Sequence, residues 1–111
     1  MKYNQGDIIL IPYPFTDLSK TKQRPAVIIS KDIANSQHYI VAKVTSVIRG
    51  DKFSFPIAAN DIDRELRYES EVRTNELFTV SQSIIIKKFA AFKIAPLQQL
   101  TEMIKDNITV A

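Results

Sequence analysis

The chain has 111 residues, no cysteine and a formal net charge of +3, and 45% of its residues are hydrophobic. A chain of this length is expected to form one domain, residues 1–111, with enough apolar content for a core. The lack of cysteine excludes disulfide frameworks and thiolate metal sites. No apolar run approaches the roughly 18 residues that cross a membrane, and the N-terminus lacks a signal peptide's apolar region. We therefore expect a soluble, cytoplasmic protein.

Charge is unevenly distributed along the chain. Residues 1–60 carry eight Lys and Arg against four Asp and Glu, whereas residues 61–71 carry five acids against two bases. This distribution would suit a nucleic-acid-binding face on one side of the molecule. Composition alone favours an ordinary solvated surface over a nucleic-acid-binding face.

The first two strands are predicted from apolar runs. Residues 8–11 read Ile-Ile-Leu-Ile, which predicts a strand buried on both faces. Residues 15–23 form a long polar loop, and loops of this length are often functional. The second strand is predicted at 26–30, where β-branched residues favour an extended backbone. Pro25 excludes the helical region for Arg24, so a cation is held where the loop becomes a strand.

Alternation predicts that the third strand, residues 39–48, buries one of its faces. Lys43 and Thr45 are expected to project together from the opposite, partly polar face. The face expected to point into the core comprises Ile40, Ala42, Val44, Ser46 and Ile48.

The second half of the chain predicts short strands and a final helix. A turn is expected at 74–76, and Pro96 is expected to open the helix. An apolar stripe on that helix should pack on the sheet; it comprises Leu97, Leu100, Ile104 and Ile108. The remaining strands are predicted at 53–57, 68–72, 77–80 and 84–94. Seven short strands and one helix indicate a mainly β fold with a C-terminal helix, a small twisted barrel.

Most enzyme signatures are absent. His38 is the single histidine, which excludes a ribonuclease mechanism that uses two histidines. The sequence has no P-loop, dinucleotide fingerprint or nucleophile elbow. The acids of residues 61–71 do not match the spacing of a calcium loop, so neither a metal nor a cofactor is expected.

The remaining candidate is an anion site around Arg24. Lys43 and Thr45 belong to it through their shared face, and Lys20 and Lys22 lie in the adjoining loop. Guanidinium groups bind phosphate bidentately and stabilise charge that develops on it, and a threonine hydroxyl can bind a phosphate oxygen. The residues thus predict a phosphate-facing site, with structural salt bridges as the alternative role for each arginine.

Five segments in order resemble the MazF/PemK toxins of type II toxin–antitoxin systems, and together they span almost the whole chain. They are residues 6–10 (Gly-Asp-Ile-Ile-Leu), 12–17 (Pro-Tyr-Pro-Phe-Thr-Asp), 24–28 (Arg-Pro-Ala-Val-Ile), 44–46 (Val-Thr-Ser) and 72–78 (Val-Arg-Thr-Asn-Glu-Leu-Phe). The resemblance implies an SH3-like barrel of the CcdB/MazF/PemK type, a homodimer, and metal-independent cleavage of single-stranded RNA, including mRNA. It also implies a cognate antitoxin with an acidic disordered segment. The toxin would contact DNA only indirectly, through that antitoxin.

The same resemblance assigns roles to individual residues. Arg24 matches the family's catalytic arginine before proline, and Thr45 matches its catalytic threonine. Arg73 matches a second cationic position that is catalytic in part of the family. Asn75 stands where those relatives have an acid, so a carboxylate base is missing at that position. The residues expected to bind substrate are Arg73, Lys43, Lys22, Lys20, Asn75 and Ser46.

The sequence therefore leads to one hypothesis and two alternatives. The hypothesis is an endoribonuclease toxin in which the RNA 2′-hydroxyl attacks the adjacent phosphate. A gyrase poison of the same fold would act through its C-terminal residues, and the tail 106–111 lacks the aromatic residue expected for that role. A non-catalytic RNA-binding barrel would need clustered stacking aromatics, whereas Phe53, Phe55 and Tyr68 are scattered and expected in the core.

Overall fold

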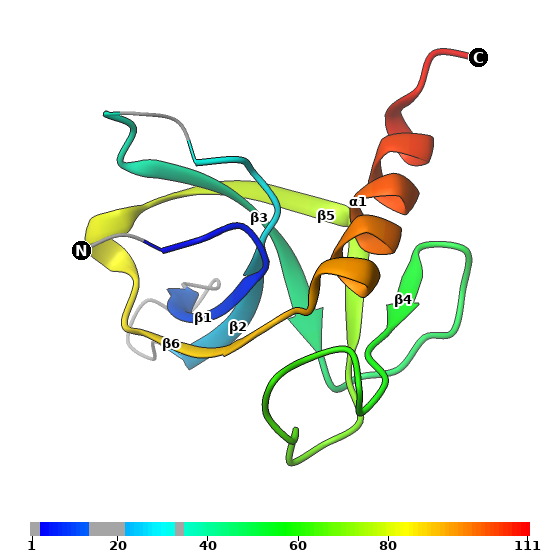
Figure 1. Ribbon diagram of the computed structural model, residues 1–111, viewed down its shortest axis with the longest axis horizontal. Helices are drawn as coiled ribbons and strands as arrows, with labels where there is room; N and C mark the ends of the chain where they lie inside the picture. Colours follow the sequence, from blue (N-terminus) through cyan, green and yellow to red (C-terminus); the bar gives the residue numbers. More distant parts are fainter. Residues whose placement is uncertain (1–2, 14–21, 33–34) are drawn as a thin grey trace.

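The computed structural model describes residues 3–13, 22–32 and 35–111. Within these residues the chain forms one antiparallel sheet of six strands, a short 3₁₀ helix and one α-helix (Figure 1). The sheet order is β4-β5-β3-β2-β1-β6. The elements are β1 (Asp7–Tyr13), β2 (Lys22–Ile28), β3 (His38–Thr45), β4 (Ser54–Pro56), β5 (Glu71–Ser81), η1 (Gln82–Ile84), β6 (Lys87–Ala91) and α1 (Ile94–Ile108).

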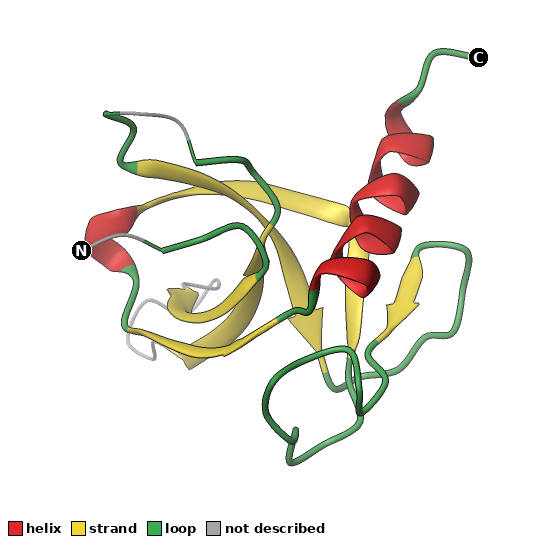
Figure 2. Ribbon diagram, viewed as in Figure 1, coloured by secondary structure: helices red, strands yellow, loops and turns green. Residues whose placement is uncertain are grey.

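The sheet curls strongly, with the helix beside it, and it does not close (Figure 2). β4 and β6 are its two edges. An isolated bridge between Ile62 and Phe92 links the chain after β4 to the chain after β6. The predicted fold class, mainly β with a C-terminal helix, is therefore confirmed, while the barrel is an open one.

Two apolar clusters use opposite sides of the same strands. Ile8 and Val27 belong to the first cluster, whereas Ile9 and Ile28 belong to the second. Successive residues of a strand point to opposite faces, so a strand with core on both faces reads as a continuous apolar run. This confirms the prediction that residues 8–11 form a strand buried on both faces. Helix α1 covers the first cluster, to which it contributes Leu100 and Ile104.

β3 departs from the predicted one-sided pattern. Tyr39 and Val41 are buried in the second cluster, although the alternation placed them on the outer face. Ile40 is 46% exposed and pairs with Thr79, which is exposed as well. The strand also ends at Thr45, so Ser46 and Ile48 lie beyond it, and both are exposed. The prediction of one core-facing set failed because β3 packs against a cluster on each side.

β5 is one strand where two strands and a turn were predicted. Between the pairs Ala42–Leu77 and Val44–Val72, β5 has four residues opposite the single residue Lys43. Edge strand β4 keeps this irregular segment in the sheet, because Ser54 pairs with Arg73. The segment 74–76 is thus a bulged stretch of strand and not a turn, which brings the number of strands from seven to six.

Helix α1 begins at Ile94, two residues before the predicted start. Pro96 still lies in the first turn, where a missing N–H costs no intrahelical bond. Leu97, Leu100 and Ile104 pack against the first cluster as predicted, but Ile108 is 70% exposed at the helix end. None of the helices in the described part of the chain has the length and apolarity to span a bilayer.

Candidate active site

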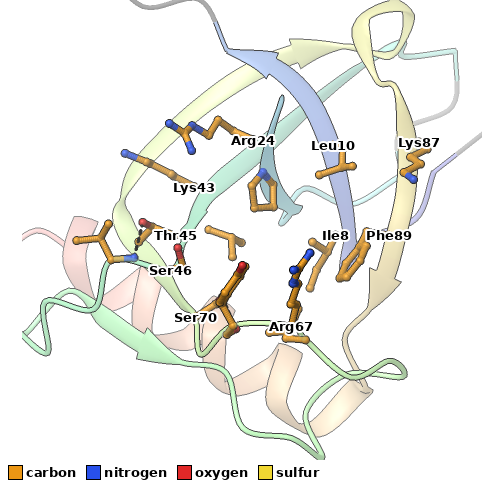
Figure 3. Close-up of a pocket in the computed structure, with 15 residues that line it drawn as sticks. Ile8, Leu10, Arg24, Lys43, Thr45, Ser46, Arg67, Ser70, Lys87 and Phe89 are labelled. Carbon is orange, nitrogen blue, oxygen red and sulfur yellow. Dashed lines mark hydrogen bonds between the residues drawn. The ribbon is translucent and has the colours of Figure 1, made fainter. Parts of the chain in front are cut away.

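A cleft of about 480 Å³ opens where four strands meet the segment between β4 and β5. Residues from β1, β2, β3 and β6 line it together with residues 66–70 (Figure 3). One wall carries two cations and two hydroxyls, from Arg24, Lys43, Thr45 and Ser46. The opposite wall carries apolar side chains, among them Ile8 and Phe89. The cleft therefore has one wall of cations and hydroxyls, and an opposite wall where apolar side chains lie beside Arg67 and Lys87.

Strand register brings Arg24 and Thr45 together. β2 and β3 are antiparallel neighbours, with Ala26 paired to Lys43. Arg24 and Thr45 each lie two residues beyond this pair, at the end where the pairing stops, and both line the cleft. Both side chains are half-buried, so they are fixed by the sheet and still reach the cleft. Four predicted site residues, Arg24, Lys43, Thr45 and Ser46, thus share one cavity.

Local contacts orient the hydroxyl and the amine of this wall. The backbone N–H of Val47 donates to Thr45 Oγ1 at 3.0 Å, which leaves the hydroxyl hydrogen for another acceptor such as a phosphate oxygen. Lys43 Nζ lies 3.5 Å from Glu76 Oε1. Glu76 therefore places a carboxylate beside the cationic wall, one residue after the expected acid position that Asn75 occupies. Sequence reasoning did not identify Glu76.

Several lining residues were not predicted from the sequence. Arg67, Lys87 and Phe89 contribute two more cations and an aromatic ring to the cleft. Tyr68 was expected in the core, but it lines the cleft and is 63% exposed. Phe55, by contrast, does pack against the first cluster. A cation followed directly by an aromatic residue, Arg67 and Tyr68, was the sequence signal that could have identified this part of the cleft.

Three other predicted substrate-binding residues lie away from the cleft. Lys22 is exposed on β2 and Asn75 is exposed on β5, and neither lines the cleft. Lys20 lies outside the described residues. Arg73 also does not line the cleft, and its side chain is only 4% exposed. The structure therefore does not bring Lys22, Asn75 or Arg73 to the wall formed by Arg24 and Thr45.

Arg73 is surrounded by three carboxylates, two from its own strand β5 and one from the loop before β4. Its Nη1 lies 2.8 Å from Glu71 Oε2 and 2.9 Å from Asp51 Oδ1, and its Nε lies 3.2 Å from Glu76 Oε2. Ser54 Oγ donates to the same Glu71 oxygen at 2.6 Å. Buried charges of this kind require partners and hydrogen bonds on all sides, and these contacts supply them.

This buried network also holds the loop that follows Thr45. Glu71 Oε1 accepts the backbone N–H groups of Arg49 and Gly50 at 3.2 and 3.3 Å. Asp51 Oδ1 accepts the N–H of Phe53 at 3.0 Å. Because Thr45 and Ser46 lead directly into this loop, the network supports the polar wall of the cleft from behind.

The network shifts the pKa values of its members. Hydrogen bonding from Arg73 lowers the pKa of Asp51 to about 2. Burial opposes ionisation of Glu71, but hydrogen bonds from Ser54, Arg73 and the loop backbone lower its pKa overall. The Asp51 carboxylate raises the pKa of Arg73. All three groups are therefore charged at neutral pH.

The structure gives no cation site among the residues it describes. In residues 3–13, 22–32 and 35–111, no three His, Asp or Glu side chains are grouped closely enough to hold a metal ion. Two of the acids in residues 61–71 accept hydrogen bonds from backbone N–H groups instead. Asp63 Oδ1 accepts the N–H of Ala91 at 2.8 Å, and Asp61 Oδ2 accepts that of Ala58 at 2.8 Å.

Solved structures with the same fold are toxins and endoribonucleases. The chain is similar to an endoribonuclease in complex with its cognate antitoxin from a mycobacterial species, with a TM-score of 0.79 and 9% identity over 99% of this chain and 100% of that one. It is similar to the MazE–MazF structure from Deinococcus radiodurans, with a TM-score of 0.79 and 15% identity over 98% and 97%. The Mycobacterium tuberculosis toxin MazF-mt6 matches with a TM-score of 0.68 and 20% identity over 90% and 93%. At these identities the similarity shows a shared fold.

Sequence comparison gives the family directly. No curated protein sequence matches the chain at a significant level. The model of one family, described as PemK-like, MazF-like toxins of type II toxin–antitoxin systems, matches residues 4–108. This match covers nearly the whole chain and includes both walls of the cleft. The chain belongs to the PemK-like, MazF-like toxin family.

Proposed function

We propose that this chain is an endoribonuclease toxin that cleaves single-stranded RNA, including mRNA, without a metal ion. The observation that supports this proposal is the convergence of Arg24, Lys43, Thr45 and Ser46 on one wall of the cleft. Two cations and two hydroxyls suit a phosphodiester group. The similar mycobacterial protein is an endoribonuclease crystallised with its antitoxin, which supports the same activity and partner here.

The proposed reaction is attack by the RNA 2′-hydroxyl on the adjacent phosphorus. The new bond joins the 2′-oxygen to phosphorus, and the bond from phosphorus to the 5′-oxygen breaks. The products are a 2′,3′-cyclic phosphate and a 5′-hydroxyl end. One proton leaves the 2′-oxygen, and one is added to the departing 5′-oxygen.

Each residue of the polar wall has a role in this proposal. Arg24 stabilises the extra negative charge that develops on the phosphoryl oxygens, and it does so from a fixed position in the sheet. Thr45 donates its hydroxyl hydrogen to orient the phosphate, while Lys43 and Ser46 hold the neighbouring oxygens. Arginine has a pKa above about 12, so it is a poor acceptor for the 2′-hydroxyl proton. Electrostatic stabilisation therefore carries most of the rate enhancement.

Two partners complete the proposal. A cognate antitoxin with an acidic disordered segment would cover the cationic wall, and the toxin would act as a homodimer. A gyrase poison is less well supported, because the cationic cleft has no role in such a mechanism. A non-catalytic RNA-binding protein is the second candidate. The sequence analysis counted against it because Tyr68 was expected in the core, but the exposed ring of Tyr68 in the cleft favours it.

Incubation of the purified protein with a long RNA in EDTA separates these functions. We expect discrete fragments that carry cyclic phosphate and 5′-hydroxyl ends, and we expect the cognate antitoxin to prevent their formation. RNA that is retarded in a gel but intact would support the non-catalytic binding protein. Intact RNA together with inhibition of gyrase supercoiling would support the poison and contradict the proposal.

A further inference from the structure

An aromatic ring that the core does not use lines the cleft. Tyr68 is 63% exposed while it lines the cleft, although most large apolar side chains of the described sheet are buried. The guanidinium group of Arg67 lies 5.4 Å from the centre of the Tyr68 ring. An exposed ring beside a cation is a typical surface for stacking a nucleobase next to its phosphate.

Hydrogen bonds fix the backbone that carries this ring. Ser70, which is buried, donates from Oγ to the carbonyl oxygen of Tyr68 at 2.9 Å. The carbonyl oxygen of Ser70 in turn accepts the N–H of Ile57 at 3.0 Å, just after β4. Leu66 packs against the first apolar cluster. The ring of Tyr68 is therefore presented by a segment that is held at both sides.

Aromatic and cationic groups from β6 line the same cleft. Phe89 lines the cleft and is half-buried, and the guanidinium group of Arg64 lies 5.7 Å from its ring centre. Lys87 lies two residues before Phe89 and also lines the cleft. Cations therefore flank both rings, which matches a strand of alternating bases and phosphates better than it matches a purely acidic peptide.

We propose that Tyr68 forms a base-stacking subsite for a nucleotide beside the cleaved linkage, with Arg67 and Lys87 contacting its neighbouring phosphates. This inference rests on the proposed ribonuclease function and adds the part of the cleft that binds the base. The cleft volume of about 480 Å³ lies within the range of roughly 300–1,000 Å³ typical of ligand sites. Stacking accepts every base, so the subsite provides affinity and leaves sequence selection to other contacts.

The chain contains no tryptophan, so the substitution Tyr68→Trp places the only indole of the protein at the subsite, as a fluorescent reporter. The probe is a pool of 2′-O-methyl RNA 12-mers, which carry bases and phosphates but no attacking hydroxyl. An abasic 12-mer with the same phosphates serves as the comparison probe, because it can bind through its charge but has no base to stack. Val110→Trp is the matched control, because Val110 is 93% exposed and lies after the helix, away from the cleft.

We expect the base-containing pool to quench the indole fluorescence of the Tyr68→Trp variant at least about twofold, and the abasic chain to leave it unchanged. The fluorescence of the Val110→Trp variant should respond to neither probe. In cleavage of RNA, Tyr68→Ala should raise KM about tenfold or more and change kcat little, as expected for the loss of one stacked base, whereas Tyr68→Phe should behave like the wild type.

Equal quenching of the Tyr68→Trp variant by the abasic chain or by a polyglutamate peptide would overturn the subsite, and so would an unchanged KM for Tyr68→Ala. If the wild type fails to cleave RNA, the proposed function fails, and the quenching experiment still decides whether bases stack here.

Discussion

Replacement of Arg24 with alanine is expected to reduce RNA cleavage at least about a hundredfold while the protein stays folded. Removal of one preorganised donor from a developing oxyanion typically costs about 10²–10³ in kcat. Arg24 is half-buried at the cleft and belongs to neither apolar cluster, so its truncation should leave the core intact. Initial rates on a fixed RNA substrate measure the first effect, and the thermal midpoint measures the second.

Two further variants separate geometry from charge. Arg24→Lys keeps the positive charge but loses the planar fork that binds two phosphate oxygens, so its rate should fall between those of the wild type and Arg24→Ala. Lys105→Ala removes the same charge from an exposed position on α1, outside the cleft, and should cleave normally. Cleavage at the wild-type rate by a folded Arg24→Ala protein would contradict the proposed role.

Replacement of Arg73 with methionine is expected to lower the free energy of unfolding by about 3 kcal/mol or more. Loss of one partner from a buried ion pair leaves an uncompensated charge, and such changes cost about 3–5 kcal/mol. Here the carboxylate left behind is Glu71, whose side chain is 1% exposed. Urea unfolding followed by circular dichroism measures the change. A loss below about 1 kcal/mol would show that the network does not stabilise the fold.

The pH dependence of the free energy of unfolding tests whether the carboxylates around Arg73 provide this stability. Asp51 and Glu71 have lower pKa values in the folded protein than in the unfolded chain. Their contribution to stability is therefore complete above about pH 4.5, and it is lost as the pH falls through 4 toward 2. We expect Arg73→Met to show a much smaller loss over that interval. Lys105→Met, the charge-matched control, should keep the wild-type dependence.

The sequence located the polar wall of the cleft because that wall depends on local features. Pro25 sets the backbone of Arg24, and the alternation of β3 places Lys43 and Thr45 on one side. The continuous run at 8–11 likewise reports a strand buried on both faces. Each of these features is determined by residues that are adjacent or two positions apart, so pattern alone was sufficient to predict it.

The rest of the site depends on contacts between distant parts of the chain. The sequence does not show that Arg73 is buried in an ion-pair network, because Asp51 lies 22 positions away and meets it only after β4 pairs with β5. Residues 68–72 alternate like a strand with Glu69 and Glu71 on one side, which places Tyr68 on the opposite, core-facing side. The strand begins only at Glu71, so this alternation does not apply to Tyr68. The continuity of β5 across residues 74–76 depends in the same way on β4 as its neighbour.

Replacement of one ribonucleotide of the substrate by a deoxynucleotide tests most directly whether the 2′-hydroxyl attacks the phosphate at this cleft. An RNA oligonucleotide with a mapped cut is compared, in EDTA, with the same molecule lacking only the 2′-hydroxyl on the 5′ side of that linkage. We expect the RNA to yield a cyclic phosphate and a 5′-hydroxyl end by mass spectrometry, and the deoxy-substituted linkage to stay intact. Cleavage of the deoxy-substituted linkage, or fragments with 5′-phosphate ends, would contradict attack by the 2′-hydroxyl in the cleft formed by Arg24 and Thr45.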